Sequence, residues 1–128
     1  MLSSAKSPQF LSRTGYGCAI VATVRGMSNP VILAKLTAAE GKRQELVAVL
    51  SGMVEHTHTE PGTQVYALHT SADDEVTVWF YERYLDEAGL AAHSGSTVMK
   101  ELGPKLAGLL GGRPELIRLN DVVSKGLS

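Results

Sequence analysis

The chain of 128 residues has one cysteine, no long hydrophobic run and almost no net charge. The single cysteine, Cys18, excludes an internal disulfide framework and a cysteine-based zinc site. No apolar run approaches the roughly 20 residues that a membrane-spanning helix needs. A formal net charge of −1 provides no field to attract nucleic acid or an anionic membrane. We therefore expect a cytoplasmic protein that binds neither.

The first 30 residues differ in composition from the rest. Their basic residues are Lys6, Arg13 and Arg25 and they contain no acid, whereas the remainder has nine basic and thirteen acidic residues. Their one apolar run, residues 18–24, is barely long enough for a secretory signal. A Ser-rich, acid-free segment is also compatible with a transit peptide, which would place the protein in an organelle matrix. We favour Met27 as the true start, with the preceding residues a disordered upstream extension that has no role in the fold.

Residues 31–122 are expected to form one α+β domain, followed by a tail at 123–128. Segments rich in β-branched and aromatic residues predict strands at 31–37, 63–70, 75–84 and 114–122. Apolar residues at three- and four-residue spacing predict helices at 41–57, 87–93 and 97–110. The order strand, helix, strand, strand, helix, strand is the ferredoxin-like split βαβ pattern. That pattern forms one antiparallel sheet with helices on one face.

Capping and breaking residues predict where these elements end. Asp86 is a suitable N-cap for the helix at 87–93, and Ser94-Gly95-Ser96 separates this helix from the next one. Gly103-Pro104 predicts a kink in the helix at 97–110, and Gly111-Gly112 predicts its end. The short polar turn at 71–74 joins two strands as an antiparallel hairpin.

The strand at 75–84 carries large apolar residues on both faces. Alternation places Val78 and Phe80 on one face, and Trp79 and Tyr81 on the other. A sheet covered on one face only should alternate apolar with polar residues. The face without helices therefore needs a partner, and a second copy of the chain is the simplest one. We predict a homodimer.

Two segments resemble the antibiotic-biosynthesis monooxygenase family. The first is Glu60-Pro-Gly-x-x-x-Tyr66, and the second is Tyr81-Glu-x-Tyr-x-Asp-Glu-Ala-x-Leu-x-x-His93-x-x-Ser96. The second segment is the more specific, and the resemblance covers residues 31–121. The family consists of small dimeric α/β-barrel proteins and includes quinol monooxygenases. The resemblance implies a dimer of ferredoxin-like domains with a hydrophobic pocket between each sheet and its helices.

The resemblance also implies a reaction: oxidation of a quinol or polycyclic phenol by molecular oxygen, with no bound metal or flavin. A deprotonated, electron-rich ring reduces oxygen itself, so the protein has to provide a dry pocket and accept a proton. Related haem-degrading enzymes carry an Asn where this chain has Ala34, so no haem is expected. A cofactor-independent monooxygenase for a small aromatic substrate is the leading hypothesis.

The expected site combines the strand at 75–84 with the helix that follows it. His93 is predicted to act as acid or base, because imidazole exchanges protons near neutral pH. Glu82 is predicted to accept a phenolic proton with a pKa raised by burial. Tyr84, Tyr66 and Phe80 are predicted to bind the substrate ring. Structural roles compete with all of these: a histidine at a helix C-terminus, a carboxylate bonded to a neighbour, and aromatic residues of the core.

Several other assignments remain open. His56 and His58 are expected to be solvated, because residues two apart on a helix point in different directions and no third metal ligand is suitably spaced. An isomerase for a phosphorylated metabolite would need basic pocket residues such as Arg118 or Lys35. A non-catalytic ligand-binding or stress protein is favoured if the pocket is closed and Glu82 is held structurally.

Overall fold

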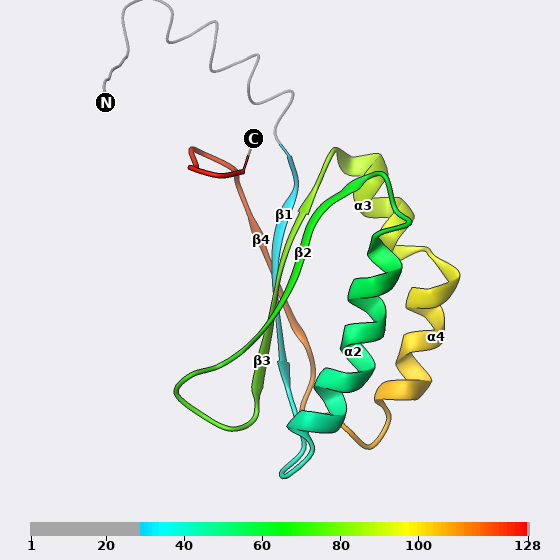
Figure 1. The fold of residues 1–128 in the computed structure, drawn as a ribbon, viewed down its shortest axis with the longest axis vertical. Coiled ribbons are helices and arrows are strands. Elements are labelled where there is room, and N and C mark those ends of the chain that lie inside the picture. The colour runs from blue at the N-terminus through cyan, green and yellow to red at the C-terminus, as the bar shows by residue number, and fades with distance from the viewer. Residues whose placement is uncertain (1–28, 128) are drawn as a thin grey trace, which may run out of the picture.

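A computed structural model describes residues 29–127, and Figure 1 shows their fold. Most of the proposed leader, residues 1–28, lies outside the described residues. The elements in chain order are β1 (Val31–Thr37), α2 (Arg43–Thr57), β2 (Thr63–Thr70), β3 (Thr77–Tyr84), α3 (Glu87–Ser94), α4 (Thr97–Leu106) and β4 (Glu115–Leu119). Within residues 29–127, no helix is long and apolar enough to cross a membrane.

The four strands form one sheet in the order β2-β3-β1-β4, and every pair is antiparallel. The three helices pack on one face of it (Figure 1). This arrangement confirms the predicted ferredoxin-like α+β fold. The register places Ala34 beside Phe80 on one side and beside Leu116 on the other. These three residues therefore share the helix-side face, whereas Trp79 points to the opposite face.

The hydrophobic core lies between α2 and the middle of the sheet. The apolar stripe predicted for α2 supplies Leu46 and Leu50, which are fully buried against Val78 and Phe80. Burying an aliphatic side chain of this size contributes about 1.5–3 kcal/mol. Two of these residues lie on α2 and two on β3, so they hold α2 against β3.

β3 begins at Thr77, two residues later than predicted, because Asp74 holds the preceding residues in a turn. Its carboxylate accepts hydrogen bonds from the backbone N–H of Val76 at 2.9 Å and of Thr77 at 2.7 Å. The Thr77 hydroxyl donates to the other carboxylate oxygen at 2.9 Å. These bonds lower the pKa of Asp74. The turn between β2 and β3 is therefore longer than the predicted 71–74.

Two predicted boundaries near the C-terminus are wrong. α4 ends at Leu106, before the predicted end at Gly111-Gly112, and Pro104 lies in its last turn. The chain turns away at Gly108, whose φ of 81° is the left-handed conformation that glycine tolerates. β4 ends at Leu119, because Asp121 leaves the ladder and binds Arg83 on β3 at 2.8 Å.

Candidate functional site

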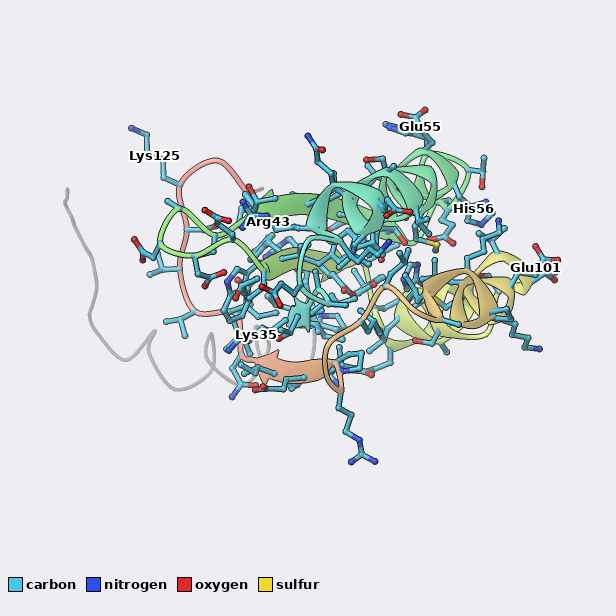
Figure 2. The ribbon with its side chains drawn as sticks, turned by 90° about the horizontal axis from the view of Figure 1, so that it is seen from below. Lys35, Arg43, Glu55, His56, Glu101 and Lys125 are labelled. Atoms are coloured by element: carbon cyan, nitrogen blue, oxygen red, sulfur yellow. The ribbon has the colours of Figure 1, made fainter. Side chains whose placement is uncertain are left out.

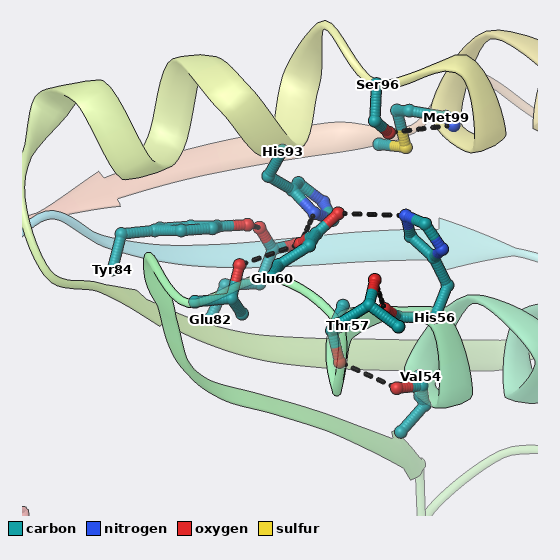
Figure 3. Close-up of polar contacts among 11 residues, drawn as sticks. Val54, His56, Thr57, Glu60, Glu82, Tyr84, His93, Ser96 and Met99 are labelled. Atoms are coloured by element: carbon teal, nitrogen blue, oxygen red, sulfur yellow. Dashed lines mark hydrogen bonds and ion pairs between the residues drawn. The ribbon is translucent and has the colours of Figure 1, made fainter.

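Four polar side chains meet on the helix-side face of the sheet, as Figure 3 shows. Glu60 comes from the turn between α2 and β2, Glu82 and Tyr84 from β3, and His93 from α3. The side chains of Tyr84 and His93 are the most enclosed, with 0% and 2% of their surface exposed. The cluster is thus part of the protein interior.

Local interactions at the start of α3 fix the direction of this helix, so that His93 in its last turn lies over β3. Asp86 is the N-cap, as predicted, and accepts from the backbone N–H of Gly89 at 2.7 Å. Gly89 also packs directly on Gly62, since a Cβ at Gly89 would lie 2.7 Å from the carbonyl oxygen of Gly62. The two glycines therefore allow the turn that carries Glu60 to approach α3 closely enough to reach His93.

Glu60 and His93 form a carboxylate–imidazole pair. Oε1 of Glu60 lies 2.9 Å from Nδ1 of His93 and accepts from the Thr63 hydroxyl at 2.8 Å. Desolvation acts to raise the pKa of Glu60, but these two hydrogen bonds and the charges of His93 and His56 lower it overall. The carboxylate is therefore ionised at neutral pH and can only accept. When the His93 ring is neutral, Nδ1 must then carry its proton, which leaves Nε2 as the basic nitrogen.

Nε2 of His93 is buried and has no hydrogen-bond partner within residues 29–127. An unsatisfied buried polar atom costs about 1–3 kcal/mol. The ring lies between Tyr66, at a centroid distance of 4.9 Å, and Tyr84, at 5.4 Å. The site therefore presents a proton acceptor in aromatic surroundings.

Glu82 is the second carboxylate of the cluster, and Tyr84 donates its hydroxyl proton to it at 2.6 Å. Burial raises the pKa of Glu82, although the bond from Tyr84 and the charge of His93 oppose this effect. Burial and the nearby carboxylates also raise the pKa of both Tyr66 and Tyr84. Both phenols are therefore neutral, and Glu82 has the raised pKa that the sequence predicted.

All five residues predicted for the site lie together. Phe80 completes the group by stacking on Tyr66, with ring centroids 4.5 Å apart. The basic residues that an isomerase would need lie elsewhere. Arg118 pairs with Glu87 at the surface, and Lys35 lies over Trp79 on the sheet, away from the helix end that carries His56 (Figure 2).

Sequence reasoning missed Glu60 and its neighbour His56. Glu60 belonged to the Glu-Pro-Gly segment, but it received no role. His56 was expected to be solvated, and this was wrong: its Nε2 lies 3.3 Å from Oε2 of Glu60, and only 28% of its side chain is exposed. The four-residue spacing of His56 and Glu60, which places side chains on the same side of a helix end, could have indicated the contact.

Tyr66 also lines an open groove of about 490 Å³ between α2 and β2. The other lining residues are Val47, Ser51, Val54, Glu55, Ala67, Leu68, His69 and Thr70. His93, Glu82 and Tyr84 do not border it, so Tyr66 is the residue that the groove and the cluster share. Within residues 29–127, no group of three or more His, Cys, Asp or Glu side chains could hold a metal ion.

These features define a ferredoxin-like α+β domain with a histidine–carboxylate site under its helices. The family model described as antibiotic biosynthesis monooxygenase matches residues 31–103. The chain belongs to this family.

Solved structures with the same fold come from several bacteria. A provisionally assigned antibiotic biosynthesis monooxygenase from Caulobacter crescentus CB15 is 23% identical, with a TM-score of 0.72 over 81% of this chain and 99% of that one. Another from Nitrosomonas europaea is 18% identical, with a TM-score of 0.72 over 78% and 96%. A protein from Mycobacterium tuberculosis is 25% identical, with a TM-score of 0.68 over 77% and 99%. The search of curated proteins gave no match.

Proposed function

We propose that the protein is a cofactor-independent monooxygenase that oxidises a quinol or other polycyclic phenol with molecular oxygen. The observation that supports this most directly is the buried Nε2 of His93, which is unpaired within residues 29–127. Glu60 fixes the proton on the other ring nitrogen, and the surrounding side chains are aromatic. Membership of the antibiotic biosynthesis monooxygenase family supports the same reaction class.

The first step is removal of a proton from the substrate. A phenolic hydroxyl placed beside Nε2 of His93 donates its proton to the nitrogen lone pair. The resulting imidazolium is stabilised by the ionised carboxylate of Glu60, 2.9 Å from Nδ1. The substrate anion is left in surroundings that exclude water, where its electrons are available to oxygen.

The substrate is then its own reductant. In an anthrone, whose enol tautomer is a phenol, a CH₂ carbon becomes a carbonyl and gives up four electrons, which reduce one molecule of oxygen. One oxygen atom forms the new carbonyl, and the other leaves as water with the two hydrogens of the CH₂ group. His93 returns the proton it took to the departing oxygen. The protein thus holds the ring, excludes water and carries one proton.

Oxygen uptake with a panel of anthrones and naphthohydroquinones tests the proposal. The natural chain should consume oxygen faster than buffer, and His93→Ala should reduce the rate by about 10²–10⁴-fold, the usual contribution of a general base. His58→Ala, which changes an exposed histidine, serves as the control. Equal rates for buffer, the natural chain and His93→Ala on every compound would rule the proposal out.

A second function is favoured by the closed state of the cluster. Tyr84 is fully buried and its hydroxyl bonds to Glu82, as expected for a non-catalytic dimeric protein that binds a ligand elsewhere. In that case the open groove beside Tyr66 would take the ligand. Calorimetric binding of the same aromatic panel, with no oxygen uptake and no effect of His93→Ala on affinity, would favour this function over the monooxygenase.

We place the protein in the cytoplasm, with an organelle matrix as the alternative if residues 1–26 are a transit peptide. Cell fractionation with detection of a C-terminal tag, and the mass of the mature chain, distinguish the two. Recovery of the protein in the organelle fraction would contradict the cytoplasmic location.

A further inference from the structure

Glu60 has different partners on its two carboxylate oxygens. Oε1 interacts with both the Thr63 hydroxyl and Nδ1 of His93. Oε2 is buried and has no hydrogen bond within residues 29–127, but Nε2 of His56 lies 3.3 Å from it. A buried carboxylate oxygen that faces neither a donor nor a positive charge is costly. His56 therefore compensates the half of the carboxylate that His93 and Thr63 leave uncovered.

The contact between His56 and Glu60 follows from the end of α2. The helix ends at Thr57, and the backbone N–H of Glu60 donates to the carbonyl of Thr57 at 2.9 Å. This continuation places residues four apart on the same side. The 3.3 Å distance is that of an ion pair when His56 is protonated, and the ring N–H is not aligned for a hydrogen bond. Because χ2 of histidine is a soft torsion, the ring can turn into alignment at little cost.

We propose that His56 is a positioning residue, which holds Oε2 of Glu60 so that His93 keeps its proton on Nδ1 and presents Nε2 as the acceptor. Its importance for turnover rests on the proposed function, whereas its effect on the tautomer of His93 does not. Without His56, Glu60 is held through Oε1 alone, and its bond to Nδ1 weakens. A histidine ring without such a partner favours the opposite tautomer in water, with the proton on Nε2.

The other groups that face His93 do not fix its tautomer. Tyr66 and Tyr84 contact the ring by their faces and edges, and the Tyr84 hydroxyl is already donated to Glu82. Among the charged groups, Glu60 alone is hydrogen-bonded to the ring within residues 29–127. The tautomer therefore depends on how firmly Glu60 is held.

Nitrogen-15 NMR of the histidine rings in the full, substrate-free chain tests this directly. His56→Leu keeps an apolar side chain of similar size but removes the N–H group, whereas His56→Gln retains an N–H donor at a similar reach. His58→Leu is the matched control, because His58 is exposed two residues away. In the natural chain, His56→Gln and His58→Leu, we expect a protonated Nδ1 and an unprotonated Nε2 on His93. In His56→Leu, the nitrogen-15 chemical shifts of Nδ1 and Nε2 of His93 should move toward each other, because the tautomer with the proton on Nε2 becomes populated.

Oxygen uptake provides the functional readout. His56→Leu should lower kcat by about 10-fold or more, as changes to groups that orient a site residue do, with little change in KM. His56→Gln should recover most of the loss. His93 shifts in His56→Leu that equal those of the natural chain, or that change equally in His58→Leu, would overturn the proposal. If the shifts move as expected but no compound consumes oxygen, the role of His56 stands and the monooxygenase proposal fails.

Discussion

β3 and β4 belong to the same sheet and both contain large apolar residues, yet they lie in opposite environments. Every residue of β3 is buried or half-buried, whereas every residue of β4 is exposed. β3 lies between two strands under the helices, while β4 pairs only with β1. The helices thus account for the apolar residues on their side of β3, but the fold of one chain does not explain why Leu116, with 70% of its surface exposed, is apolar.

The exposed apolar surface continues beyond β4 into Val122 and Val123, the latter 87% exposed. Large exposed apolar patches are a common feature of interaction sites. The ion pair between Arg83 and Asp121, at 2.8 Å, ties this segment to β3. The two strands thus differ in that β3 supports the chain's own site, whereas β4 leaves its apolar side chains exposed.

The largest effect is expected from a charge placed on β4. We propose that the chain is a homodimer that covers this strand and the helix-free face of the sheet. Ile117 lies on that face, because it pairs with Leu33, the neighbour of Tyr81. Ile117→Asp should therefore halve the mass measured by light scattering at micromolar concentration, since an interface cannot bury an unpaired carboxylate cheaply. Glu101→Lys on α4 is the control and should leave the mass unchanged.

A natural chain that is already monomeric under these conditions would contradict the dimer. The exposed residues of β4 would then need another partner, and Ile117→Asp would change nothing in the mass.

The next largest difference between β3 and β4 is expected in the stability cost of truncating one side chain on each strand. Phe80→Ala on β3 should lower the free energy of unfolding by about 3–5 kcal/mol, the usual cost of a core phenylalanine. Leu116→Ala on β4, made in the Ile117→Asp background, should stay within about 0.5 kcal/mol, as surface changes do. Urea denaturation measures both. Both changes are compared in the Ile117→Asp background. Similar losses of unfolding free energy for Phe80→Ala and Leu116→Ala would show that β4 is packed within its own chain.

A single added methyl group should disturb the contact between α3 and the turn that carries Glu60. A Cβ at Gly89 would lie 2.7 Å from the backbone of Gly62, which cannot move aside as a side chain can. Gly89→Ala should therefore destabilise the chain by about 1–3 kcal/mol, the usual cost of overpacking. Gly52→Ala on α2, with nothing within 4 Å of the new methyl, should instead stabilise by up to about 1 kcal/mol. Thermal unfolding of the two variants compares them, and a neutral Gly89→Ala would mean that the turn is loosely seated.

Local patterns predicted most of the fold but only part of the site. The strands and the Asp86 cap follow from neighbours in sequence, and strand alternation placed Glu82 and Tyr84 on the face that α3 covers. The pairing of Glu60 with His93 joins residues 33 apart, through a contact between two glycines that no periodicity reveals. The early end of β4 likewise depends on a tertiary contact, that of Asp121 with Arg83.

The smallest expected effect distinguishes the two carboxylates of the site. Burial raises the folded-state pKa of Glu82, so its contribution to stability is present below the unfolded pKa and is lost as pH rises through the folded pKa. Glu60 behaves in the opposite way: its hydrogen bonds lower its folded-state pKa, so its contribution is present above the unfolded pKa and is lost as pH falls. Glu82→Gln should therefore reduce the loss of unfolding free energy as pH rises. Glu60→Gln should reduce the loss of unfolding free energy as pH falls. Urea denaturation is measured between about pH 3 and 8, because this range includes the ordinary pKa values of carboxyl groups and the raised pKa of Glu82. Two variants that change the same side of the profile would show that the carboxylates act as one coupled pair, and their separate roles beside His93 would have to be abandoned.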